Sequence, residues 1–166
     1  MTVNQCLMTI AACLILLAGT VPTFARKRMR VPVPEDIAQE LVKNGEDADL
    51  RAESVDLNDD GRPELIVKGD CAVVGNCSTW IFHVTRRGHR LLLNNEAQMV
   101  RIGKAGIRGY RDVLFQVHDS AYGSTVLTYK FDGSQYHLNN CVYQNYGCKD
   151  QKGRLHINKR PRLERC

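Results

Sequence analysis

The sequence predicts an α+β domain that consists mainly of antiparallel β-sheet and carries one short N-terminal helix. After position 52, short runs of β-branched and aromatic residues recur between Gly, Asn and Asp turns. Only residues 35–44 show helical periodicity. Two β-rich segments also resemble each other. We therefore expect two blade-like β-meander units that cover each other's apolar face as a sandwich or half-barrel.

An uncharged apolar segment at the start of the chain predicts an export signal over residues 1–25. No charged residue occurs from Leu7 to Ala25, and the segment ends in TFA, with the small residues at −3 and −1 that signal peptidase requires. Basic residues favour a rival topology, since residues 1–6 contain none and residues 26–30 contain four. An uncleaved membrane anchor is therefore the alternative. After cleavage the protein is periplasmic or secreted, with no permanent membrane span.

The remaining chain divides by charge. The net charge is +5, and it is concentrated in residues 26–30 and 149–166, whereas the body between them is mildly acidic. We interpret residues 26–34 as a basic extended linker, 35–148 as a single β-rich domain and 149–166 as a basic C-terminal tail. Such tails attract anionic polymers through nonspecific electrostatics, without specific recognition of nucleic acid. A solvated tail without a partner is the alternative.

The expected elements follow in chain order. The helix over residues 35–44 places Ile37, Leu41 and Val42 on one face and acidic residues in its first turn. Strands are expected at 65–67, 79–85, 91–93, 113–117, 126–131 and 136–138. The aromatic residues of these strands follow an alternating strand pattern, which predicts core positions for Trp80, Phe82, Phe115, Tyr129 and Phe131.

An internal duplication is visible in the β region. Residues 61–67 read GRPELIV, and residues 109–115, which start 48 positions later, read GYRDVLF. Each segment precedes a Gly-containing loop, an aromatic-rich strand and a turn at Gly88 or Gly133. Repeats of this length with several strands are typical of propeller blades, but two units cannot close a ring. They are therefore expected to pack on each other, with chance similarity of two meanders as the alternative.

Cysteine spacing predicts disulfide bonds. Cys71 and Cys77 enclose a short Gly-containing loop and are expected to pair. Cys141 is expected to pair with Cys148, although Cys166 competes for either, and one thiol is left over. Close cysteine pairs in a small exported domain are typical of oxidising compartments. Buried free thiols are the alternative if the domain is cytoplasmic.

One motif carries site chemistry. Residues 56–67 read DLNDDGRPELIV, in which oxygen-bearing side chains stand at alternate positions before and after Gly61. Calcium takes about six to eight oxygen ligands, and alternate side chains of a tight loop can face one centre. The expected ligands are Asp56, Asn58, Asp60, the Arg62 carbonyl and Glu64. A metal-free turn, in which Asx side chains cap their own backbone, is the alternative.

This stretch resembles the D-x-N/D-x-D-G-x-x-D/E loop of FG-GAP and VCBS repeats, the calcium-binding blades of integrin-type propellers and many bacterial surface proteins. The resemblance implies the same five calcium ligands and covers about a dozen residues. The chain has no Phe-Gly-Gly-Ala-Pro segment and no array of repeats. The second copy lacks the ligands, since Lys104, Gly106 and Arg108 stand in their places.

The sequence offers no convergent catalytic set. His118, Asp119 and Ser120 are adjacent, but neighbours on a strand point to opposite faces. We therefore expect a non-catalytic periplasmic or secreted binding protein that is stabilised by one calcium ion and recognises a protein or glycan. The alternatives are a cell-envelope association protein that binds anionic polymer through its basic tails, and a small hydrolase whose site assembles only in the fold.

Overall fold

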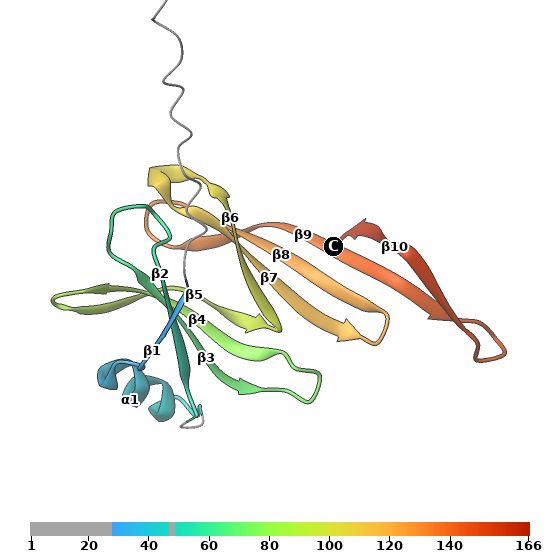
Figure 1. Cartoon of the computed structure of the whole chain (residues 1–166), viewed down its shortest axis with the longest axis horizontal. Helices are drawn as coiled ribbons and strands as arrows, with labels where there is room; N and C mark the ends of the chain where they lie inside the picture. The colour runs from blue at the N-terminus through green and yellow to red at the C-terminus, as the bar shows by residue number, and fades with distance from the viewer. Residues whose placement is uncertain (1–27, 47–48) are drawn as a thin grey trace, which may run out of the picture.

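The computed structural model describes residues 28–46 and 49–166, which form two antiparallel five-stranded sheets and one α-helix (Figure 1). The first sheet has the order β1 (Met29–Val31), β2 (Arg51–Val55), β3 (Glu64–Cys71), β4 (Cys77–Thr85) and β5 (Gly88–Ala97). The second has the order β10 (Leu155–Arg165), β9 (Tyr136–Lys149), β8 (Gly123–Phe131), β7 (Arg111–Ser120) and β6 (Met99–Ala105). The expected mainly antiparallel fold is confirmed. The predicted export signal at residues 1–25 lies outside the described residues.

Four strands of each sheet have the same topology. Strands β2–β5 and β6–β9 are each four-stranded meanders in which every strand pairs with its neighbour in sequence. The GRPELIV segment leads into β3, and the GYRDVLF segment leads into β7. β1 extends the first meander and β10 the second. The two units therefore pack against each other as expected, although strands β1, β2, β6 and β10 have no counterpart among the strands that the sequence predicted.

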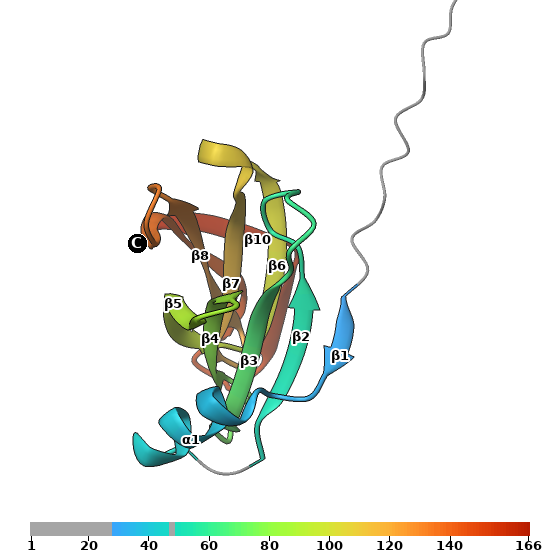
Figure 2. The same ribbon diagram turned by 90° about the vertical axis from the view of Figure 1, so that its left-hand side faces the viewer.

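Helix α1 (Glu35–Lys43) covers the outer face of the first sheet, the face turned away from the second sheet (Figure 2). Ile37 and Leu41 are buried, as their helical spacing predicts, whereas Val42, which was expected on the same face, is exposed. They pack on the residues of β2, β3 and β4 that point outward: Ala52, Leu65, Val67, Trp80 and Phe82. His89 of β5 fastens the helix, since its ring nitrogens each lie 2.8 Å from a carboxylate oxygen, one of Asp36 and one of Glu40.

The larger core lies between the sheets. Alternate residues of each strand point inward, so β3 contributes Ile66 and β4 contributes Ile81, while β7 contributes Val113. Tyr110 stacks on Phe131 with ring centroids 3.9 Å apart. The predicted aromatic core is confirmed, because all five of its members are buried: Trp80, Phe82, Phe115, Tyr129 and Phe131.

The disulfides differ in part from those expected. Cys71 pairs with Cys77 as predicted. The expected bond between Cys141 and Cys148 is wrong, because Cys141 pairs with Cys166 and Cys148 is a free, exposed thiol. The reason is that Cys141 and Cys148 lie on one extended strand, β9, which separates them by about 20 Å. Cys166 directly follows β10, whose antiparallel register brings Arg165 opposite Val142.

The C-terminal segment, which the sequence predicted to be a basic tail over residues 149–166, contains a strand. Residues 155–165 form β10, which pairs with β9 from Leu155 to Arg165 around one irregularity. The turn between β9 and β10 lies beyond the end of the first sheet (Figure 1). Most of β10 is therefore exposed on both faces. None of the helices within residues 28–46 and 49–166 has the length and apolar character needed to cross a bilayer.

Candidate functional site

The loop that connects β2 to β3 folds around the carboxylate of Asp56. One oxygen of Asp56 accepts hydrogen bonds from the backbone N–H groups of Asn58, at 3.2 Å, and Asp59, at 2.7 Å. The other accepts the N–H of Gly61 at 3.0 Å. Asp59 and Gly61 both have positive φ, 62° and 78°, which glycine and short polar residues tolerate best. The sequence D-x-N-D-D-G therefore closes a tight loop because its side chains satisfy its own backbone donors.

Two more of the predicted ligands stand inside this network. The Asn58 side-chain oxygen accepts the Asp60 N–H at 3.2 Å, and its amide donates to Asp60 at 3.0 Å. Asp60 in turn accepts the Arg62 N–H at 2.7 Å. Desolvation opposes ionisation of Asp60, but the hydrogen bonds from Arg62 and Asn58 outweigh it and lower the pKa of the carboxyl. Asp60 is therefore charged at neutral pH.

The corresponding loop of the second unit contacts the Asp56 loop. The Arg111 N–H donates to the Leu57 carbonyl at 2.8 Å, and the Arg111 guanidinium lies 3.4 Å from Asp59. Gly109, with φ 77°, comes so close that a Cβ atom there would lie 2.8 Å from the Asn58 carbonyl oxygen. The two meander units thus meet at their β2–β3 and β6–β7 connections. This contact fixes the position of the Asp56 loop relative to both sheets.

Glu64 occupies a different environment from the other expected ligands. Its side chain is fully buried, and one oxygen accepts the Leu57 N–H at 2.8 Å. The other lies 3.0 Å from His83 Nδ1 and accepts a hydrogen bond from the Tyr110 hydroxyl at 3.3 Å. Burial, then the neighbouring Glu64 carboxylate, raises the pKa of Tyr110 to about 12, so the hydroxyl remains a donor. Glu64 therefore ties β3 to β4 and to the second sheet.

The positions of these side chains can be compared with the ligand set that a calcium ion requires. Asp56, Asn58 and Asp60 are held in one hydrogen-bonded turn, as a set of loop ligands must be. Within residues 28–46 and 49–166, no three His, Cys, Asp or Glu side chains gather closely enough to hold a metal ion. A cation at this loop would therefore depend on the Asn58 amide and main-chain carbonyls as well as on two carboxylates. Glu64 as a ligand stays a prediction.

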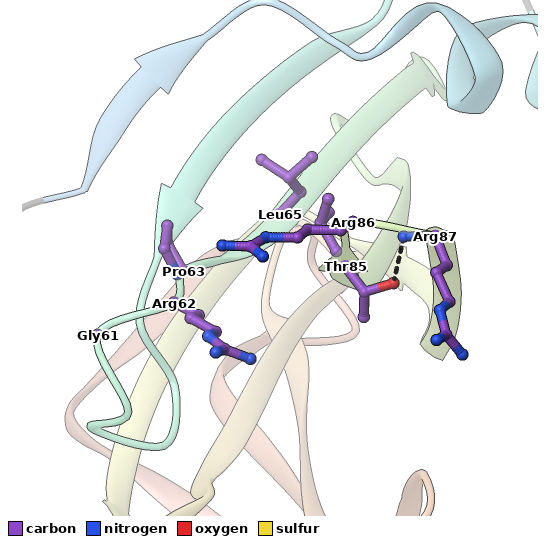
Figure 3. A pocket seen from close by; sticks show the side chains of 8 residues that line it. Gly61, Arg62, Pro63, Leu65, Thr85, Arg86 and Arg87 are labelled. Carbon is purple, nitrogen blue, oxygen red and sulfur yellow. Dashed lines mark hydrogen bonds between the residues drawn. The ribbon is translucent and has the colours of Figure 1, made fainter.

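An open groove of about 900 Å³ adjoins the loop, and sequence reasoning did not identify it. It is lined by residues 61–63 on one side, by residues 84–87 on the other and by Leu65. We call it the arginine groove, because Arg62, Arg86 and Arg87 are three of its eight lining residues (Figure 3). The two adjacent arginines of the β4–β5 turn, Arg86 and Arg87, are visible in the sequence as a local concentration of positive charge. Their proximity to Arg62 depends on the pairing of β3 with β4, which the sequence did not reveal.

Arg86 and Arg87 form the tip of a two-residue hairpin turn. Thr85 closes the turn, because its hydroxyl accepts the Arg87 N–H at 3.2 Å and donates to the Gly88 carbonyl at 3.0 Å. Figure 3 shows the Arg86 side chain reaching back across Leu65 toward the Gly61–Pro63 segment. The arrangement places three arginine side chains above an apolar floor, which is suited to binding.

Comparison of the chain with protein-family models, with curated proteins and with solved structures finds no match. The resemblance of residues 56–67 to FG-GAP and VCBS loops therefore rests on the motif itself.

Proposed function

We propose that this chain is an exported, non-catalytic binding protein that one calcium ion stabilises at the Asp56 loop and that recognises a protein or glycan. The observation that carries the proposal is the adjacency of this self-closed loop to the arginine groove, since Gly61 and Arg62 belong to both. A loop that is rigid on one side and lines a groove on the other is typical of binding sites on a stable scaffold.

The two disulfides support an oxidising compartment for the folded domain. Cys141–Cys166 joins β9 to the residue that follows β10, at the open end of this hairpin and away from its turn (Figure 1). Cys71–Cys77 closes the β3–β4 connection. Both bonds thus hold exposed segments that bury few apolar side chains of their own.

Calcium is proposed in a structural role. The negative charges of Asp56 and Asp60 meet in one turn, and a divalent cation offsets their repulsion while taking oxygen ligands. Extracellular modules bind calcium with Kd of roughly 10⁻⁴–10⁻³ M. At ten times Kd, calcium adds only about 1.4 kcal/mol of stability. The proposed ion therefore steadies the loop and the adjoining groove.

Thermal unfolding with calcium and with EDTA tests this proposal. We expect calcium to raise the Tm of the wild-type protein by several degrees and to leave the Tm of Asp60→Ala unchanged. Asp132→Ala is a matched control, because Asp132 also accepts main-chain N–H groups, those of Ser134 and Gln135, in an Asx turn elsewhere. That variant should lose stability but keep its response to calcium. Equal Tm values of the wild type in calcium and EDTA would remove the ion from the account.

A second candidate function, association with anionic polymer, is favoured by the position of β10. This edge strand exposes a row of basic side chains over a short distance: Lys159, Arg160, Arg162 and Arg165. Clustered basic residues attract sulfated or phosphorylated polymers in a salt-dependent manner. Deletion of residues 149–166 would also remove a paired strand and Cys166, so it is not a clean test.

Charge substitution on β10 tests this second candidate without breaking the sheet. Polymer binding through β10 predicts that Lys159→Gln combined with Arg160→Gln elutes from a sulfated polysaccharide column at lower salt than the wild-type protein. The pair Arg62→Gln and Arg86→Gln removes the same charge from the arginine groove instead. Greater loss of retention from the groove pair than from the β10 pair would contradict polymer binding through β10.

A further inference from the structure

We infer that the arginine groove binds a sulfate or phosphate group carried by the ligand. This inference deepens the proposed binding function, on which it rests, by naming the chemistry of the bound group. No acidic residue lines the groove, whereas three of its lining residues are arginines. Within the described part of the chain, the side chains of Arg62, Arg86 and Arg87 make no ion pair or hydrogen bond. Other arginines do pair with acids, for example Arg28 with Glu53 and Arg154 with Asp150.

The groove holds its charges on two fixed supports. On one side, Gly61 takes a positive φ, Pro63 restricts the chain, and the Arg62 N–H is bound by Asp60. On the other side, the Thr85 hydroxyl closes the turn that presents Arg86 and Arg87. Both supports are anchored before a ligand arrives. Less of the backbone must therefore be ordered on binding, which reduces the entropic cost.

The chemistry of the lining favours a compact oxyanion. A guanidinium group is weakly hydrated and donates two parallel hydrogen bonds to an oxyanion, and the charge of each bond strengthens it. Two arginines that face the groove from opposite sides can share one tetrahedral group with several terminal oxygens. Asp60 lowers the local potential near Arg62, but its carboxylate is occupied by the Arg62 N–H and the Asn58 amide.

The position of the groove in the sheet disfavours an extended peptide. The floor belongs to β3 and β4, and each of these strands is hydrogen-bonded on both sides. A peptide could therefore not add as another strand and gain main-chain hydrogen bonds there. Leu65 and Val84 offer apolar contact beneath the guanidinium groups. A sulfated or phosphorylated saccharide or small molecule meets both features, and an acidic peptide meets only the charge.

Titration of the disulfide-bonded protein with defined anions tests the inference. The probes are inorganic sulfate, inorganic phosphate, a sulfated disaccharide and an acidic peptide, each followed by NMR amide shifts at constant ionic strength. We expect sulfate or phosphate groups to shift the amides of Gly61, Arg62 and residues 85–88. Arg62→Gln combined with Arg86→Gln should weaken binding of the sulfated disaccharide at least about tenfold. Arg86→Lys should weaken it less, because the charge remains but the paired donors are lost.

The control is Lys159→Gln combined with Arg160→Gln, which removes the same charge from β10 and should leave the affinity within about twofold. The inference is overturned if the control pair weakens binding as much as the groove pair, if no probe binds, or if the acidic peptide binds more tightly than the sulfated disaccharide. The calcium melt separates this failure from that of the proposed function. A calcium-dependent Tm that Asp60→Ala abolishes would preserve the stabilised loop without an anion site.

Discussion

The carboxylate of Glu64 lies 3.0 Å from Nδ1 of His83 while its own side chain is fully buried. The two residues lie beside the cross-strand pair Leu65 and Phe82, so they stand opposite each other on β3 and β4. Tyr110 reaches the same carboxylate from the second sheet. A charged group in the core is stable only when it is paired and hydrogen-bonded. Glu64 therefore joins the two sheets through a buried polar contact.

Removal of this carboxylate should be costly. We expect Glu64→Ala to lower the free energy of unfolding by about 3–5 kcal/mol, because the Leu57 N–H, His83 and Tyr110 lose their common partner. Glu64→Gln should cost less, about 1–3 kcal/mol, since it keeps the shape and an acceptor oxygen. Urea unfolding measures both values. Glu96→Ala, on an exposed position of β5, is the control and should change stability by no more than about 0.5 kcal/mol. A similar cost at Glu64 and Glu96 would contradict the assigned role.

The attachment of helix α1 should depend on pH through His89. Burial opposes protonation of His89, but hydrogen bonds to Glu40 and Asp36 outweigh it and raise the pKa of the ring above its ordinary value of 6.5. A raised folded-state pKa contributes stability that is complete below 6.5 and is lost as pH rises through the folded-state value. The stability gap between wild type and His89→Gln should thus be larger at about pH 5.5 than at about pH 8.5. A gap that grows with pH would be inconsistent with this pairing.

Asn76 links the Cys71–Cys77 loop to the second sheet. Its side-chain amide donates to the His118 carbonyl at 2.9 Å and accepts the His118 N–H at 2.8 Å, like a strand residue. We expect Asn76→Ala to destabilise the protein by about 2 kcal/mol, because two main-chain groups lose their partner. Asn94→Ala, on an exposed position of β5, provides the comparison in urea unfolding. Equal midpoints for the two variants would show that the Asn76 link is dispensable.

The disulfide pattern makes a chemical prediction. Alkylation of the native, unreduced protein should label Cys148 and leave Cys71, Cys77, Cys141 and Cys166 unlabelled. Peptide mapping by mass spectrometry then locates the label and the two cross-linked peptides. Label on Cys166, together with a Cys141–Cys148 cross-link, would require a different arrangement of β9 and β10.

Local patterns predicted the elements that bury a face. The helix over residues 35–44 and the aromatic strands show clear periodicity because one side of each packs on the core. Strand β10 has no buried face, since Leu155, Ile157 and Leu163 are all exposed. It is held in place by its pairing with β9 and by the disulfide bond of Cys166. The disulfide bonds likewise were predictable only where the two cysteines are close in the sequence. The local Cys71–Cys77 loop was predictable, whereas the Cys141–Cys166 bond required the register of two strands.

The site was predictable only in its local part. The spacing of Asp56, Asn58 and Asp60 around Gly61 predicted a tight turn, and their hydrogen bonds form one. The burial of Glu64 depends on His83 and on the second sheet, which no local pattern encodes. The arginine groove likewise requires the register that places residues 61–63 beside the turn at residues 86–87. Contacts between distant segments thus account for what the sequence did not reveal.

Calcium titration, followed through the backbone amide signals of the Asp56 loop, shows whether this loop binds the ion. We expect the amides of residues 58–62 to shift together and saturate with a Kd of roughly 10⁻⁴–10⁻³ M, while the Asp132 turn does not respond. Asp60→Ala should abolish the shifts. Loop amides that remain unchanged at about 10 mM calcium, well above the expected Kd, would contradict a calcium-stabilised loop.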